Sequence, residues 1–176
     1  MKFIKTKIEG AYIIELEPFK DHRGFFARTF CVKEFKKQGL NYNMVQTNLS
    51  GSQFKNTLRG LHYQVDDGEE DKLVKCIRGK LLDVILDVRR DSNTFGEYVM
   101  VELTESNDKM VYLPRGCAHG SLTLEDNTQM FYQTTNYYFP EKERGIRWND
   151  PYFKILWSIE NPILSEKDSN FKDFVV

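Results

Sequence analysis

The sequence predicts an all-β protein built as a jelly-roll barrel of short antiparallel strands. From residue 44 onward, segments that alternate apolar and polar side chains follow one another with turn residues between them. Such segments at a spacing of about 8–12 residues are typical of a sandwich or barrel. The chain of 176 residues suits one core and contains no repeat or disordered linker, so we expect a single domain over residues 1–176.

The first part of the chain predicts a strand pair, a turn and a short helix. Residues 3–17 alternate around a turn at Glu9 and Gly10, and residues 21–24 form a second turn signal before a strand over 25–30. Residues 32–37, followed by Gly39, predict a short helix.

The rest of the chain predicts strands followed by a mixed tail. We expect the strands at residues 44–49, 58–65, 73–77, 81–88, 98–103, 110–113, 121–124 and 130–138. After Pro151 the pattern is mixed, and the Ser165-x-x-Asp168 spacing is the signature of a helix start, which predicts a C-terminal helical segment.

Composition argues against several classes of partner. Lys plus Arg total 25 and Asp plus Glu total 26, so the net charge of −1 provides no basic field for nucleic acid or a membrane surface. The N-terminus alternates apolar and charged residues, unlike a signal peptide, and no window has transmembrane length. The cysteines Cys31, Cys76 and Cys117 are odd in number and far apart, which disfavours disulfides and predicts a reducing cytoplasm.

The segment 57–64 carries the first candidate for chemistry. A histidine side chain gains and loses a proton near neutral pH, and an arginine is a permanent cation that holds phosphate or carboxylate. His62 and Arg59 together therefore suggest acid–base work on an anionic substrate. The alternative for His62 is a structural, hydrogen-bonded residue of a strand.

Asp83 is a second candidate, because jelly rolls commonly hold ligands in their interior. Asp83 and Asp87 share one face of their predicted strand with Leu81 and Ile85. This alternation leaves two alternatives, in which Asp83 points into a cavity or into solvent.

His119 lies in the stretch 114–120, which is similar to the Pro-x-Gly-x-x-His half of a cupin motif. The other half usually supplies His-x-His and a Glu to bind a metal, whereas here it reads His62-Tyr-Gln64. A three-histidine site would need every histidine of the chain, and His22 sits in a turn at the wrong end of the pattern. We therefore predict no catalytic metal.

Motifs spread over nearly the whole chain identify a family resemblance. They lie at residues 21–26, 45–48, 59–64, 72–74, 83–89, 116–120, 131–135, 148–151 and 164–168. Together they resemble the dTDP-4-dehydrorhamnose 3,5-epimerase family. The resemblance implies a cupin jelly roll without metal or cofactor, usually a homodimer, that epimerises a nucleotide-linked 4-keto-6-deoxyhexose at C3 and C5. Its product would feed deoxysugar synthesis for lipopolysaccharide or capsule.

The same resemblance implies the catalytic roles. A C–H bond beside a ketone is a weak acid, so inversion needs a base on one face, a stabiliser for the enolate oxygen and an acid on the opposite face. By the family pattern His62 is the base, Lys72 the stabilising cation and Tyr132 the acid. Asp168 corresponds to the carboxylate that pairs with His62, although it is also the fourth residue of the predicted capping box.

Further positions match substrate-binding residues of the family. Arg23 and Arg59 resemble diphosphate-binding arginines, and the segment 23–30, which includes Phe26, would reach the site of a neighbouring subunit. The resemblance adds contacts to the nucleotide and sugar from Gln46, Asn48, Asp83, His119 and Tyr138.

Arg28 departs from the family pattern. The dTDP-specific members typically have a Glu there to accept the thymine N3–H, whereas arginine only donates. Either the substrate is a GDP- or CDP-linked sugar, or Arg28 faces solvent or phosphate and thymine is read elsewhere. Cys117 and Ser121 stand where the family commonly has phenylalanine. Either they enlarge the sugar pocket, or a shifted neighbour packs against them and fills the space.

Two alternatives to double epimerisation stay open. One is a C3-only or C5-only epimerase, or a keto-isomerase that uses the same enolate. The other is a sugar-nucleotide-binding cupin without catalysis.

Overall fold

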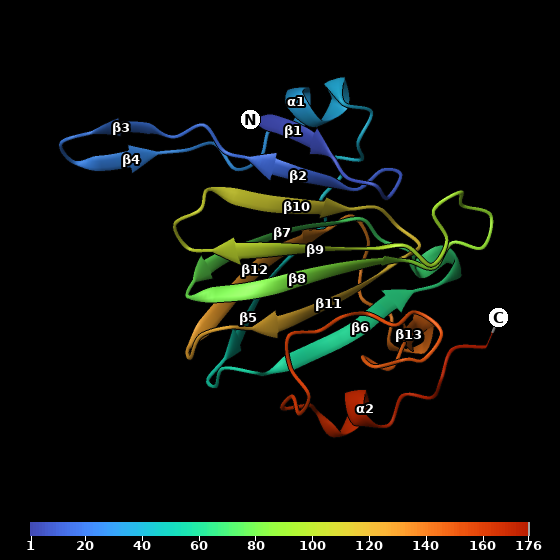
Figure 1. Ribbon diagram of the computed structural model, residues 1–176. Coiled ribbons are helices and arrows are strands. Elements are labelled where there is room, and N and C mark those ends of the chain that lie inside the picture. Colours follow the sequence, from blue (N-terminus) through green and yellow to red (C-terminus); the bar gives the residue numbers. More distant parts are fainter. Residues whose placement is uncertain (176) are drawn as a thin grey trace.

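The computed structural model describes residues 1–175, which form an all-β fold of two facing antiparallel sheets (Figure 1). The six-stranded sheet has the order β1 (Lys2–Lys5), β2 (Tyr12–Glu15), β10 (Lys109–Leu113), β7 (Lys72–Arg78), β12 (Thr128–Thr134) and β5 (Gln46–Ser52). The five-stranded sheet has the order β13 (Glu143–Gly145), β6 (Leu58–Gln64), β11 (Cys117–Thr123), β8 (Lys80–Asp87) and β9 (Tyr98–Thr104). From β5 to β8 the chain alternates between the sheets, as in a jelly roll, so the predicted fold class is confirmed.

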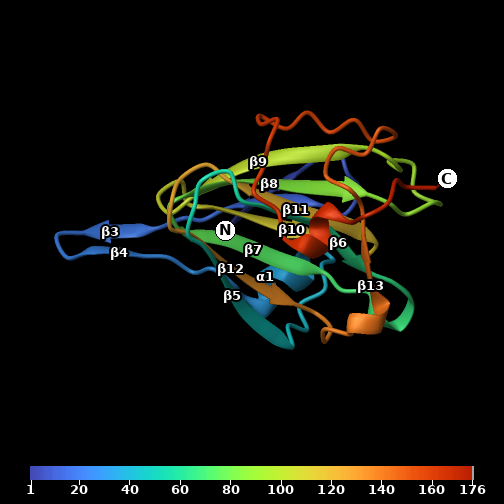
Figure 2. The ribbon, with the colours of Figure 1, turned by 90° about the horizontal axis from the view of Figure 1, so that it is seen from below.

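Helices are short, and one hairpin stands apart from the sheets. The helices are α1 (Val32–Lys37) and α2 (Glu166–Ser169), and the 3-10 turns are η1 (Asp66–Gly68) and η2 (Pro140–Lys142). The hairpin of β3 (Phe19–Asp21) and β4 (Gly24–Phe26) extends away from the sheets in both views (Figures 1 and 2). No helix among residues 1–175 has the length and apolar character needed to cross a membrane.

The main core fills the space between the sheets and follows the strand alternation. Leu81 and Ile85 of β8 point inward against Val74 of the six-stranded sheet, while Leu82 and Val84 point outward. The predicted division of this strand into two faces is confirmed, and it places Asp83 on the inward face with an exposed fraction of 0%.

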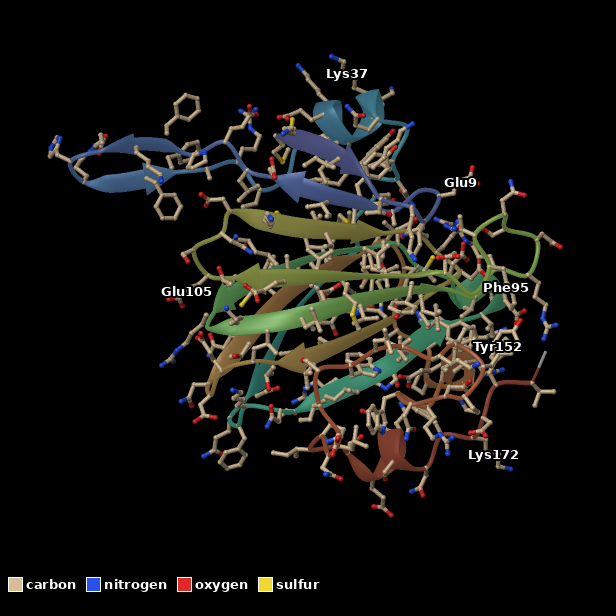
Figure 3. All side chains as sticks on the ribbon, viewed as in Figure 1. Glu9, Lys37, Phe95, Glu105, Tyr152 and Lys172 are labelled. Atoms are coloured by element: carbon tan, nitrogen blue, oxygen red, sulfur yellow. The ribbon has the colours of Figure 1, made fainter. Side chains whose placement is uncertain are left out.

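Two further clusters cover the outer faces of the sheets. Phe35 of α1 is fully buried against Ile14 and Tyr112 of the six-stranded sheet. The C-terminal segment covers the five-stranded sheet, and its Tyr152 lies beside Phe95 with ring centroids 6.3 Å apart (Figure 3). Because α1 and the C-terminal segment cover the outer faces of the two sheets, strands of both sheets carry apolar residues on both faces.

Several predicted boundaries need correction. The strand predicted over 25–30 ends at Phe26, because the chain then turns back and Phe30 packs beside Phe35. β11 starts at Cys117 instead of 121, since all its residues are buried and no alternation reveals it. β12 ends at Thr134 instead of 138, where the Thr134 hydroxyl donates to the Asn136 carbonyl. β13 was not predicted at all.

Candidate active site

Two adjoining cavities open between the sheets, with volumes of about 320 and 250 Å³. Both are lined by His62, Lys72 and Tyr132. These three residues come from β6, β7 and β12, so both sheets contribute to the shared wall. Asp168 also lines the smaller cavity, so all four predicted catalytic residues meet at one place.

The six-stranded sheet presents its side chains in cross-strand rows. In the register of β12, Tyr132 lies opposite Asn48 on β5, and Thr134 lies between Gln46 on β5 and Lys72 on β7. Alternate residues of a strand point to the same face, so all five side chains line the larger cavity.

The opposite wall depends on an irregularity in β6. His119 of β11 pairs with His62 of β6, but Ser121 pairs with Arg59. An advance of two residues along β11 thus corresponds to three residues along β6, which is a β-bulge in β6. The extra residue on β6 turns Arg59 and His62 to the same side, and both line the smaller cavity. Gly60 has φ +99°, and a Cβ on it would lie 2.4 Å from the His119 carbonyl oxygen. Only glycine fits this close approach.

His62 and Asp168 form a hydrogen-bonded pair. His62 Nε2 lies 2.6 Å from Asp168 Oδ1, and the Gly60 amide donates to Asp168 Oδ2 at 3.3 Å. Burial would raise the pKa of Asp168, but the hydrogen bond and the charge of His62, together with Gly60, outweigh it and hold the pKa below its usual range. The carboxylate is therefore ionised near neutral pH.

Asp168 also belongs to the helix cap that the sequence predicts. Ser165 is the N-cap of α2, and its side chain accepts a hydrogen bond from the Asp168 backbone N–H at 3.0 Å. The cap uses the backbone of Asp168, while its carboxylate faces His62. The two sequence interpretations are thus compatible.

A second histidine–carboxylate pair lies beside the first. His119 Nε2 is 2.7 Å from Asp83 Oδ2, and His119 lines the smaller cavity with Ser121. Asp83 thus faces the interior and not solvent, and its Oδ1 has no hydrogen-bond partner among residues 1–175. Cys117, in contrast, is not a cavity residue, because it packs in the main core.

The comparisons with known proteins identify the family of the chain. The family model for dTDP-4-dehydrorhamnose 3,5-epimerase matches residues 5–175. The chain belongs to the dTDP-4-dehydrorhamnose 3,5-epimerase family. As a member of this family it is an epimerase, one type of isomerase.

Relatives in the family include both double and single epimerases. The dTDP-4-dehydrorhamnose 3,5-epimerase of Shigella flexneri is 43% identical and covers 99% of this chain and 97% of its own. The Legionella pneumophila dTDP-6-deoxy-D-glucose-3,5-epimerase, solved with dTDP-4-keto-L-rhamnose, has a TM-score of 0.91 at 38% identity, over 98% of this chain and 92% of its own. A 3'-monoepimerase from Streptomyces bikiniensis, solved with dTDP-quinovose, has a TM-score of 0.90 at 32% identity, over 97% of this chain and 86% of its own.

Two carboxylates of this candidate site were not predicted from the sequence. Glu70 lies 3.1 Å from the Lys72 ammonium and lines the larger cavity. Burial raises the pKa of Tyr132, and the negative charge of Glu70 adds to the effect. Glu70 stands two positions before the start of β7 at Lys72, outside the strand, so strand alternation in the sequence does not assign it to the cavity.

Glu143 is the other carboxylate, and it sits on the unpredicted strand β13. It accepts a hydrogen bond from Tyr138 Oη at 2.7 Å and forms an ion pair with Lys167. The bond to Glu143 and burial raise the pKa of Tyr138 to about 12. Lys167 lies next to Asp168, so this ion pair joins β13 to α2 at the rim of the site.

Three predicted substrate-binding residues lie outside the cavities of their own chain. Arg23 sits on the hairpin and pairs with Asp21 at 2.6 Å, and Phe26 is 69% exposed. Arg28 follows the hairpin and pairs with Glu34 at 3.1 Å. None of the three lines either cavity.

Proposed function

We propose that the protein is a 3,5-epimerase of a dTDP-linked 4-keto-6-deoxyhexose. The observation that carries the proposal is the position of His62 and Tyr132 on facing sheets, with one cavity between them and Lys72 on its wall. A base and an acid on opposite sides of a substrate carbon are what inversion requires. The ligand of the Legionella relative supports the choice of sugar nucleotide.

His62 is the base in this mechanism. Because Asp168 is ionised and accepts from Nε2, it fixes the tautomer that carries its proton there and leaves Nδ1 with a lone pair. Nδ1 removes the proton from the carbon beside the C4 ketone. Asp168 then stabilises the imidazolium that forms.

Lys72 and Tyr132 complete the reaction. The Lys72 ammonium stabilises the enolate oxygen that develops when the proton leaves. Tyr132 returns a proton to the carbon from the facing sheet. Burial and Glu70 keep its phenol protonated near neutral pH, because both raise its pKa. After the first inversion His62 carries the extra proton and Tyr132 is a phenolate. His62 must therefore release a proton to solvent, and Tyr132 must take one up, before the same set acts on the second of the two centres, C5 and C3.

The nucleotide in this proposal is bound by Arg59, Gln46, Asn48 and Tyr138. Arg59 Nη2 donates to the Gly51 carbonyl at 3.1 Å, which orients its guanidinium along the rim of the smaller cavity. The dTDP ligands of the Legionella and Streptomyces relatives support a thymidine nucleotide. Arg28 is already paired with Glu34, so we do not assign it to a guanine or cytosine edge.

Calorimetry tests the choice of nucleotide base. We expect dTDP to bind more tightly than GDP or CDP, and tighter binding of GDP or CDP would contradict the assignment of thymine.

We propose further that the enzyme is a homodimer in which the segment 23–30 enters the partner's site. The hairpin exposes three phenylalanines, Phe19, Phe25 and Phe26, at 76%, 68% and 69%. An apolar patch on an element that projects from the sheets (Figure 1) favours coverage by another surface. Arg23 would then supply its positive charge to the partner's diphosphate.

A complementation experiment tests this dimer. Homodimers of Arg23→Ala and of His62→Asn should both be nearly inactive. After unfolding and refolding together, the mixture should regain activity, because one site of each mixed dimer is intact. A mixture as inactive as its components, despite a dimeric mass by light scattering, would contradict the shared site.

A single-centre epimerase is the second candidate, because a 3'-monoepimerase has the same fold. Deuterium incorporation from D2O into dTDP-4-keto-6-deoxyglucose, read by NMR, separates the alternatives. Incorporation at C3 and C5 supports the double epimerase, and incorporation at one position supports the second candidate. Binding without incorporation would instead indicate a non-catalytic cupin.

We place the reaction in cytoplasmic deoxysugar synthesis, in keeping with the free cysteines Cys31, Cys76 and Cys117.

A further inference from the structure

An aromatic side chain from the C-terminal segment packs against His62. The rings of Phe171 and His62 have centroids 5.7 Å apart and an interplanar angle of 78°, an edge-to-face contact. Phe171 lies just beyond α2, the helix that carries Asp168. The C-terminal segment thus contacts the imidazole twice, through a carboxylate and through a ring.

Gly145 leaves the space that this ring occupies. In the pairing of β13 with β6, Gly145 lies directly opposite His62. A Cβ on Gly145 would lie 2.0 Å from Cζ of Phe171 and 2.1 Å from its Cε1. Any side chain at this position would therefore push the phenyl ring away. Because the ring is the far end of a side chain, it would swing off His62 without disturbing the strand.

The two contacts restrain His62 in different ways. The hydrogen bond to Asp168 fixes one nitrogen but leaves the ring free to tilt about that bond. An edge-to-face aromatic contact opposes tilting, because the ring would have to leave its favourable geometry. Proton abstraction depends on the direction of the Nδ1 lone pair, so a tilted ring reacts more slowly.

We propose that Phe171 is a positioning residue for His62, and that position 145 is glycine in order to admit its ring. The inference rests on the proposed function, in which His62 is the base. Beyond that function, it assigns Phe171 the role of holding the His62 ring in its reactive orientation, and Gly145 the role of leaving space for Phe171.

The test is a double-mutant cycle of Phe171→Ala, Gly145→Ala and the combination. We expect each single variant to lower kcat about 10-fold with little change in KM, because orientation and not binding is lost. We expect the double variant to be no slower than Phe171→Ala, because Gly145→Ala acts only by displacing the ring. Losses that multiply in the double variant would overturn the role of Gly145.

An NMR measurement tests the contact without any substrate. The chain has three histidines, so the imidazole C–H signals of His62 can be assigned by the His62→Asn variant. Phe171→Ala removes a ring current and should shift these signals but not those of His22, and Gly145→Ala should shift them in the same direction. A protein that lacked epimerase activity but gave these shifts would refute the proposed function and retain the contact.

Phe171→Leu is a second variant for the case in which Phe171→Ala does not fold, because leucine keeps apolar volume at this position. It should show the same NMR shift with a smaller loss of kcat. Unchanged kcat in a folded Phe171→Ala variant whose His62 signals have moved would overturn the positioning role.

Discussion

At the scale of single residues, the site depends on the pairing of each reactive group with one partner. Asp168 holds His62, Glu70 holds Lys72, and Asp83 holds His119. Asp83 and Asp168 are buried, and Glu70 is partly buried at the wall of the larger cavity. A charge without a counterpart would be costly in such places. The first pair is the most direct to test.

Asp168→Asn should lower kcat by about 100-fold or more, because an amide neither fixes the required tautomer nor stabilises the imidazolium. The amide oxygen still accepts from the Gly60 N–H, so we expect the variant to fold. Steady-state kinetics and a thermal melt measure both. A folded Asp168→Asn variant with full turnover would show that the pair has no catalytic role.

Tyr132→Phe should separate proton removal from inversion. Without the phenol, His62 still removes the proton and returns a deuteron from D2O to the same face. We therefore expect exchange to continue while inverted product becomes scarce, as followed by NMR of the sugar protons. Tyr137→Phe is the matched control, because Tyr137 is 58% exposed and lies outside both cavities. Normal inversion by Tyr132→Phe would remove it from the acid role.

At the scale of elements, the bulge in β6 sets the geometry of the site. It turns Arg59 and His62 to the same side and brings Gly60 against the backbone of β11. Alternation in the sequence predicted β6 correctly but would place residues three apart on opposite faces. A bulge depends on the pairing with a neighbouring strand, so no local pattern predicted it.

Gly60→Ala should therefore impair both stability and turnover. The added Cβ meets the His119 carbonyl oxygen at 2.4 Å, in addition to the strain of its positive φ. Gly39→Ala is a suitable control, because Gly39 also has a positive φ of +73° but has nothing within 4 Å of its Cβ. We expect Gly60→Ala to lose about 1–3 kcal/mol more than the control in urea unfolding, with a large loss of kcat. Equal effects would mean that the close approach has no importance.

At the scale of the whole molecule, buried carboxylates make the free energy of unfolding depend on pH in the acid range. Asp87 is fully buried and accepts hydrogen bonds from Arg89, Ser92 and Thr94. Burial would raise its pKa, but these bonds outweigh burial and lower the pKa to about 2. The folded state therefore binds this proton more weakly than the unfolded state does.

The stability that Asp87 contributes is fully present above its unfolded pKa, near pH 4, and is lost as the pH falls toward about 2. We expect the free energy of unfolding to decrease by about 2 kcal/mol over this range through Asp87. Asp87→Asn should show a correspondingly smaller difference between pH 5 and pH 2 in urea titrations. An unchanged pH dependence in a folded variant would show that Asp87 does not control acid stability.

The sequence by itself determined the all-β class, the helix over residues 32–37, the cap of α2 and the family, because alternation, turn residues and ordered motifs are local signals. Only the tertiary structure decided that Asp83 faces the interior, that Cys117 packs in the core, and that Glu70, Glu143 and Phe171 surround the reactive groups. It also separated Arg23, Phe26 and Arg28 from the cavities of their own chain. These outcomes depend on which strands pair, in which register, and on what covers each face. Such choices join residues far apart in sequence, so no local pattern encodes them.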